Sequence, residues 1–152
     1  MAQAPGADPA YDQGMETSRR RAVRIRTKRV YDKPDASDGR RILIDRLWPR
    51  GLAKTVAKID FWAKAVAPSN DLRRWYRHEP AKWREFRRRY FAELDANPDG
   101  VAELRSQLGR GTVTVLFGSK ETRLNNATAL CEYLTSRRPA RRLTGAGSRR
   151  GG

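Results

Sequence analysis

Residues 42–51, with the sequence ILIDRLWPRG, decide the fold class. Ile42, Leu43 and Ile44 form a continuous apolar run, which is typical of a strand buried on both faces of a sheet. Pro49 and Gly51 then turn the chain out of that sheet, because proline cannot donate to a strand ladder. Buried strands of this kind occur in sheets covered by helices, so the stretch predicts an α/β domain.

Two further stretches predict strands on either side of this one in the sequence. Residues 23–28 alternate apolar or β-branched side chains with basic ones, and residues 112–117 read TVTVLF. If the sheet has a fourth strand, we expect it within residues 54–59.

Helices are expected between the second and third of these strands. Asp60 is the expected cap of a short helix that ends before Pro68, and Ser69 is the expected cap of the next. Pro80 and Pro98 suit the first turns of two more helices, and a fifth follows residues 118–120. The predicted fold is a small, mostly parallel sheet of three to four strands covered by five helices, with disordered termini.

The charge of the chain is strongly positive and unevenly distributed. Its 152 residues include 33 Lys and Arg against 17 Asp and Glu, a formal net charge of +16. Residues 1–21 balance three acids with three arginines, whereas residues 137–152 carry six arginines and no acid. Both segments lack hydrophobic periodicity, so we predict a disordered N-terminal segment (1–21), one domain (22–136) and a disordered basic tail (137–152).

Several kinds of site and location are not expected. A single cysteine, Cys131, leaves no intramolecular disulfide or multi-cysteine zinc site, and a single histidine, His78, leaves no two-histidine metal motif. We expect no metal and no cofactor. The sequence has no apolar run of membrane-spanning length and no secretory leader, so we expect a cytoplasmic protein without a membrane partner.

Three segments together resemble a known family. They are ILIDRLWPRGL (42–52), FWAKAVAPSNDLRRWYRHEPAKWREFRRRYFAEL (61–94) and TVTVLFGSKE (112–121). They are similar to the YeaO-like branch of domain-of-unknown-function family 488, over about residues 23–136. The resemblance implies a compact bacterial α/β domain but no activity. The family pattern A-R-D-E-x-H-N implies a histidine where this chain has Leu124, so a metal or proton-transfer role at that position is not expected here.

The carboxyl ends of parallel strands are the usual ligand sites of α/β sheets. Arg46 and Arg50 follow the second strand and suit a phosphate or carboxylate, with Asp45 orienting one guanidinium. After the third strand, the backbone N–H groups around Ser119 precede a helix and suit an oxyanion. The predicted anion site consists of Asp45, Arg46, Arg50, Lys64, Ser69, Ser119 and Lys120. The structural alternative is a buried Asp45–Arg46 ion pair beside a packed Trp48–Pro49 corner.

A different function class also fits the charge. Arginines on a predicted helix and in the tail would contact nucleic-acid phosphates without sequence specificity. These residues are Arg84, Arg87, Arg88, Arg137, Arg138, Arg141 and Arg142. The alternative is that they form a solvated helix face and a solubilising tail. For His78 we expect a capping or surface position and for Cys131 an inert buried thiol; enzymatic activity and oligomeric state stay open.

Overall fold

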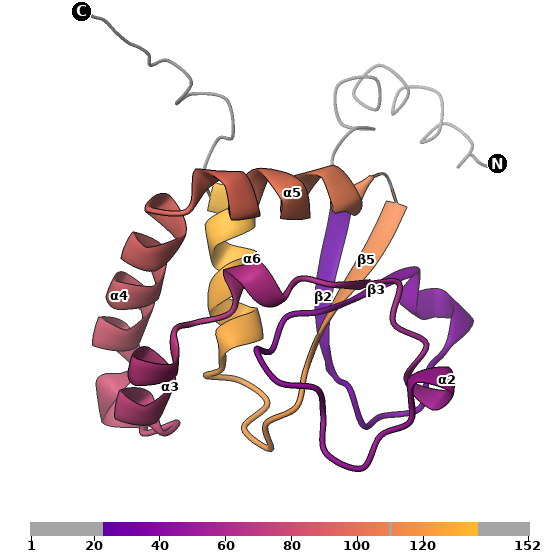
Figure 1. Cartoon of the computed structure of the whole chain (residues 1–152), viewed down its shortest axis with the longest axis horizontal. Helices are drawn as coiled ribbons and strands as arrows, with labels where there is room; N and C mark the ends of the chain where they lie inside the picture. Colours follow the sequence, from indigo (N-terminus) through magenta and orange to yellow (C-terminus); the bar gives the residue numbers. More distant parts are fainter. Residues whose placement is uncertain (1–22, 110, 137–152) are drawn as a thin grey trace, which may run out of the picture.

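The computed structural model describes residues 23–109 and 111–136. Within them lies a four-stranded parallel sheet with the strand order β2-β5-β3-β4. Figure 1 shows β2 and β5 side by side. The strands are β2 (Val23–Arg29), β3 (Arg40–Leu43), β4 (Phe61–Trp62) and β5 (Gly111–Phe117). The expected α/β class and strand number are therefore confirmed. The disorder expected for residues 1–21 and 137–152 concerns segments outside the described residues.

Five α-helices accompany the sheet in the described part of the chain, as expected. They are α2 (Lys54–Ala57), α3 (Asn70–Tyr76), α4 (Trp83–Asp95), α5 (Pro98–Leu108) and α6 (Asn126–Ser136). Short 3-10 turns lie at Ala36–Asp38 (η1), Lys64–Val66 (η2) and Pro80–Lys82 (η3). None of these described helices is long and apolar enough to cross a bilayer.

The core lies on both faces of β5, because successive side chains of a strand point to opposite faces. Val113, Val115 and Phe117 pack against the main cluster, which contains the buried residues of α3, α4, α5 and α6. On the opposite face, Leu116 packs with Leu43 in a smaller cluster that includes two half-buried tryptophans. β5 is thus buried on both sides. The two-sided burial predicted for Ile42, Leu43 and Ile44 is confirmed, since Leu43 belongs to the smaller cluster and its two neighbours belong to the main cluster.

The local signals for helix starts at Ser69, Pro80 and Pro98 are confirmed. The Ser69 hydroxyl accepts a hydrogen bond from the backbone N–H of Leu72 at 3.1 Å, which caps α3. Pro80 occupies the first turn of η3, directly before α4, and Pro98 opens α5. Asn97 provides the side-chain cap of α5 by accepting from the N–H of Gly100.

The region before α3 differs from the prediction. Residues 54–57 form helix α2 instead of a strand, and Phe61–Trp62 form strand β4 instead of a helix. Asp60 does not cap a helix: its carboxylate accepts a hydrogen bond from the backbone N–H of Arg41 at 2.8 Å. The partner that fixes Asp60 is therefore on a neighbouring strand, nineteen residues earlier in the chain.

A buried ion pair holds the connection between β2 and β3 in place. The carboxylate of Asp38 is fully buried and pairs with Arg41 and with Lys28, whose Nζ lies 2.9 Å away. The Arg41 guanidinium also donates to the carbonyl of Ala57 at 2.8 Å, which ties α2 to the sheet. Gly39 follows with φ of 67°, and a Cβ there would lie 2.2 Å from the carbonyl oxygen of Thr112. Only glycine fits where the backbone at position 39 passes the carbonyl of Thr112.

Candidate functional site

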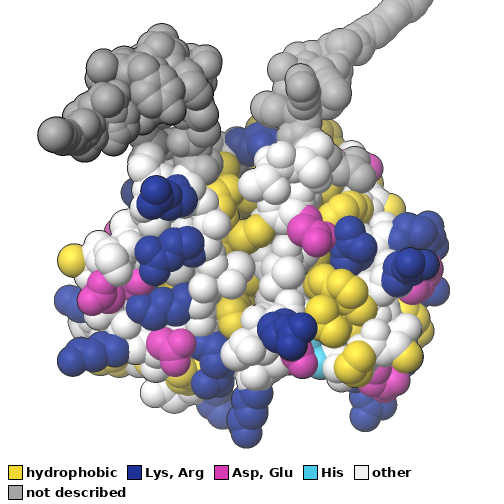
Figure 2. Space-filling view, turned by 180° about the vertical axis from the view of Figure 1, so that it is seen from behind, with side chains coloured by type: hydrophobic (Ala, Val, Ile, Leu, Met, Phe, Trp, Pro, Cys, Tyr) yellow, Lys and Arg dark blue, Asp and Glu magenta, His cyan; other side chains and the backbone are white. Residues whose placement is uncertain are grey.

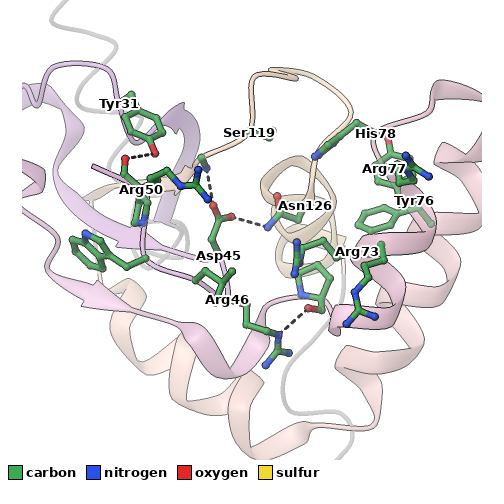
Figure 3. Close-up of a pocket in the computed structure, with 17 residues that line it drawn as sticks. Tyr31, Asp45, Arg46, Arg50, Arg73, Tyr76, Arg77, His78, Ser119 and Asn126 are labelled. Atoms are coloured by element: carbon green, nitrogen blue, oxygen red, sulfur yellow. Dashed lines mark hydrogen bonds between the residues drawn. The ribbon is translucent and has the colours of Figure 1, made fainter. Parts of the chain in front are cut away.

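A pocket of about 690 Å³ lies at the carboxyl ends of β3 and β5 (Figure 3). This volume is in the range that protein sites for small molecules usually have. The lining residues include five arginines and one carboxylate, that of Asp45. The pocket is therefore strongly cationic at its wall.

Asp45 lies two residues after the end of β3 and is fixed by two hydrogen bonds, one from the residue that follows β5 and one from the first residue of α6. Its Oδ2 accepts from the N–H of Gly118 at 2.8 Å, and its Oδ1 accepts from Nδ2 of Asn126 at 3.1 Å. Burial raises the pKa of Asp45 above its usual value, although these hydrogen bonds act in the opposite direction. Asp45 thus joins the ends of β3, β5 and α6 at one point.

Arg46 and Asp45 are not paired, which corrects both sequence-based expectations for them. No described ion pair involves Asp45. The Arg46 guanidinium instead donates to the backbone carbonyls of Ala67 and Pro68, each at 3.3 Å. Arg46 therefore lines the pocket while holding the segment before α3 against it.

The loop after β5 also differs from the expected oxyanion site. The N–H of Gly118 is already used by Asp45, and the carbonyls of Gly118 and Ser119 accept from the guanidinium of Arg29. Helix α6 begins only at Asn126, so no helix N-terminus follows this loop directly. What the loop contributes to the pocket wall is Gly118 and Ser119.

Three further arginines, which the sequence did not predict as site residues, also line the pocket. Arg73 and Arg74 belong to α3, and Arg77 is the residue that ends it. Arg73 and Arg77 are four residues apart, a spacing that puts two side chains on one face of a helix and was the available signal. We refer to Arg46, Arg50, Arg73, Arg74 and Arg77 together as the pocket arginines.

The backbone at the end of α3 is strained. Arg77 and His78 have φ values of 46° and 54°, in the left-handed region that favours glycine. Both residues line the pocket, and Figure 3 shows them on the side facing Arg50, with Asp45 and Asn126 between. Strain of this kind is concentrated at functional sites, where the placement of a side chain outweighs its cost.

Aromatic side chains form the apolar part of the wall. Tyr76 and Phe86 line the pocket and stack with ring centroids 4.3 Å apart. The Tyr76 hydroxyl donates to the carbonyl of Leu124 at 2.7 Å, and burial raises its pKa to about 12. Across the pocket, the Tyr31 hydroxyl donates to the carbonyl of Arg50 at 2.9 Å and holds the Trp48–Pro49 corner in position.

Of the seven residues in the predicted anion site, four line the pocket: Asp45, Arg46, Arg50 and Ser119. The other three lie outside it. Lys64 places its Nζ 4.6 Å from the ring centre of Trp62, Ser69 donates to the Glu93 carboxylate at 2.6 Å while capping α3, and Lys120 is exposed.

The arginines of α4 are largely paired with acidic side chains. Nε of Arg87 lies 2.7 Å from the Glu132 carboxylate, and Arg88 pairs with Glu85 at 2.7 Å, whereas Arg84 is exposed. Hydrogen bonds from Arg88 and Arg89 lower the pKa of Glu85 to about 2. Figure 2 shows basic side chains interspersed with acidic ones on the back of the molecule. The predicted contacts at Arg137, Arg138, Arg141 and Arg142 concern residues outside the described ranges.

The remaining candidates from the sequence are His78 and Cys131. His78 is exposed at the pocket and lies edge-on to Tyr76, with ring centroids 5.4 Å apart. Burial raises the pKa of the Cys131 thiol to about 12, which suits an inert thiol. The described residues hold no group of three or more His, Cys, Asp or Glu side chains that would bind a metal ion.

Comparisons with known proteins place the chain in a family. The family model described as "Inactive DUF488-N3 subclade" matches residues 24–148. The chain is 40% identical over 117 residues to the uncharacterized protein Rv3073c of Mycobacterium tuberculosis, covering 77% of this chain and 98% of that protein. It is also 40% identical over 114 residues to the uncharacterized protein YeaO of Escherichia coli, covering 75% of this chain and 99% of that protein. No solved structure matches. The chain therefore belongs to the DUF488 family, as a YeaO-like member.

Proposed function

We propose that this protein binds an anionic small molecule, bearing a phosphate or a carboxylate, in the pocket at the carboxyl ends of β3 and β5. The observation that carries the proposal is the convergence of five arginines and a single carboxylate on one pocket. Guanidinium groups bind phosphate and carboxylate oxygens through paired hydrogen bonds, which makes such a wall selective for anions.

Two of the pocket arginines are available for a ligand. Within residues 23–109 and 111–136, the side chains of Arg50 and Arg77 make no hydrogen bond or ion pair. Arg77 is in addition held at the wall by a strained backbone. A guanidinium without a protein partner can use its N–H donors for a bound anion.

We propose binding without chemical turnover. The matching family model is described as an inactive subclade, and Leu124 occupies the position at which the family resemblance implies a histidine. Leu124 contributes its backbone carbonyl to Tyr76 and is not part of the pocket wall described above. A cytoplasmic location is part of this proposal and stays a prediction.

The test is a melting experiment with a panel of nucleotides, sugar phosphates and dicarboxylates. A ligand at one hundred times its Kd stabilises the folded state by about 2.7 kcal/mol, a readily measured increase in Tm. We expect Arg50→Gln combined with Arg77→Gln to abolish the increase. Arg84→Gln, an exposed arginine of α4 outside the pocket, is the matched control and should retain it.

Two results would contradict the proposal. One is a panel in which no phosphate or carboxylate ligand raises the Tm of the wild-type protein. The other is an equal increase in the wild type and in the double variant, because binding would then take place elsewhere.

Nucleic-acid binding by the α4 arginines and the C-terminal arginines stays the alternative. It has less support, because Arg87 and Arg88 are already paired with acidic side chains. Binding to duplex DNA that weakens with salt at a log–log slope of about −0.9 for each phosphate neutralised would favour it.

A further inference from the structure

The polar floor of the pocket differs chemically from its cationic wall. Asp45, Ser119 and Asn126 line the pocket together, and Asp45 and Asn126 lie between Arg50 on one side and Arg73 and Arg77 on the other (Figure 3). We refer to Asp45, Ser119 and Asn126 as the acceptor floor.

The acceptor floor presents oxygen atoms with unused acceptor capacity. Each carboxylate oxygen of Asp45 receives one hydrogen bond from the protein, and a carboxylate oxygen accepts about two. Asn126 uses its amide nitrogen on Asp45, which leaves its Oδ1 as an acceptor. The Ser119 hydroxyl donates to the carbonyl of Glu121 at 3.1 Å, so its lone pairs are also available.

The orientation of these acceptors is fixed by the fold. Gly118 holds one Asp45 oxygen and Asn126 holds the other, so the carboxylate cannot rotate without losing a bond. A Cβ at position 118 would lie 3.0 Å from Asp45 Oδ2, so a glycine allows this close approach. Fixed acceptors discriminate between ligands, because a ligand without a matching donor leaves them unpaired.

A carboxylate at this place would repel an anionic group set directly against it. The anionic group of a ligand is therefore expected beside Arg73 and Arg77, and the part that reaches Asp45 must donate hydrogen bonds. An amine would meet the surrounding arginines as a like charge, whereas neutral hydroxyl groups would not. Several neighbouring acceptors suit several neighbouring hydroxyls.

We propose that the ligand is a phosphorylated polyol of the sugar-phosphate class, with its phosphate on the α3 arginines and its hydroxyls on the acceptor floor. This inference rests on the proposed function, since it names the substance class that the same pocket binds. It adds a requirement that the arginines alone do not impose, namely that the ligand carries hydroxyl donors.

The experiment compares ribose 5-phosphate with n-butyl phosphate, which has the same charged group and no hydroxyls, by calorimetric titration of the full chain. We expect ribose 5-phosphate to bind at least about tenfold more tightly, from hydrogen bonds to a charged acceptor. Asp45→Asn should remove most of that difference while leaving n-butyl phosphate binding intact or stronger. Ser119→Ala, which keeps the Asp45 contacts, should reduce it by a few fold. Ser106→Ala on α5 is the control and should change neither affinity.

The outcomes separate this inference from the proposed function. Equal binding of the two phosphates to the wild type would overturn the hydroxyl requirement and leave anion binding intact. Equal losses of both phosphates in Asp45→Asn would also overturn it, because Asp45 would then only support the fold. If Asp45→Asn does not fold, the Ser119→Ala variant provides the test: an unchanged preference for ribose 5-phosphate over n-butyl phosphate would overturn the inference. Failure of both phosphates, and of the wider panel, would refute the proposed function itself.

Discussion

Replacement of Arg77 by glycine should stabilise the fold and weaken the site. Arg77 ends α3 with φ of 46°, where glycine is the usual residue. The left-handed conformation costs a non-glycine residue about 1–2 kcal/mol. Glycine also lowers the free energy of unfolding by about 0.4–1 kcal/mol, because it gives the unfolded chain more conformational freedom. The balance is a stabilisation of about 0.5–1 kcal/mol, or about 2–4 °C in Tm for a domain of this size.

The same substitution should reduce phosphate binding. It removes one guanidinium from the pocket wall, and a hydrogen bond to a charged group contributes about 1.5–3 kcal/mol. Because Arg77 is exposed, we expect the lower end of that range, about a tenfold increase in Kd. Thermal melts without ligand and calorimetric titration with ribose 5-phosphate measure the two effects separately.

Lys58 provides the matched control. It ends α2 with φ of 48°, is exposed, and does not line the pocket. Lys58→Gly should raise the Tm by a similar amount and leave the affinity unchanged. The reasoning is refuted if Arg77→Gly lowers the Tm while Lys58→Gly raises it, since contacts of Arg77 would then outweigh its strain. It is also refuted if both variants bind the phosphate as the wild type does.

Three further predictions concern the fold. Burial alone would raise the pKa of Asp38, but hydrogen bonds from Lys28, from the backbone of Asp35 and from Arg41 lower it overall. Its carboxylate therefore stabilises the fold above about pH 4, and this contribution is lost as the pH falls through the lowered pKa. Asp38→Asn should lower the free energy of unfolding, measured in urea at pH 7, by about 3 kcal/mol, and the stability of the variant should depend less on acidic pH. A loss below about 1 kcal/mol would contradict this. Cys131 is half-buried and its thiol has a pKa of about 12, so at pH 8 a thiol-specific reagent should label the native protein much more slowly than the urea-unfolded protein; equal labelling rates would contradict this. Gly39→Ala should lower the free energy of unfolding by more than about 3 kcal/mol, because the new Cβ would collide with Thr112. Gly51 has φ of 74° but open space around it, so Gly51→Ala should lower it by only about 1 kcal/mol. Equal losses in the two variants would refute the steric argument.

The sequence predicted those elements whose signals are local. Ser69 caps α3 through a bond to a residue three positions later, and Pro98 opens a helix whose first turn needs no N–H from it. The apolar run of Ile42, Leu43 and Ile44 matched a segment buried on both faces of the sheet, because burial on both sides removes the need for alternation.

Elements that depend on distant partners could not be predicted in this way. Phe61–Trp62 is too short to show any periodicity and exists as a strand because β3 lies beside it. Asp60 has the residue type of a helix cap, but it accepts from the backbone of Arg41 in the neighbouring strand. Neither relation can be derived from spacing along the chain.

Only the site residues that follow the strands could be predicted from the sequence. The rule that ligands bind at strand ends selected four residues that line the pocket and one, Lys120, that does not; the four are Asp45, Arg46, Arg50 and Ser119. It passed over Arg73 and Arg77, because the place where a helix ends depends on how its aromatic residues pack against neighbouring helices. Here Tyr76 stacks on Phe86, and that contact brings the end of α3 to the pocket.

The order of strands in the sheet has a consequence for biosynthesis. β5, the last strand of the described residues, lies between β2 and β3, and these two strands have no hydrogen bonds with each other. While the ribosome is still making residues 23–109, β2 has no strand partner in this sheet and β3 has only the two residues of β4. β2 and β3 therefore remain without their shared partner until residues 111–117 emerge and insert between them, so folding is completed late and through long-range pairing.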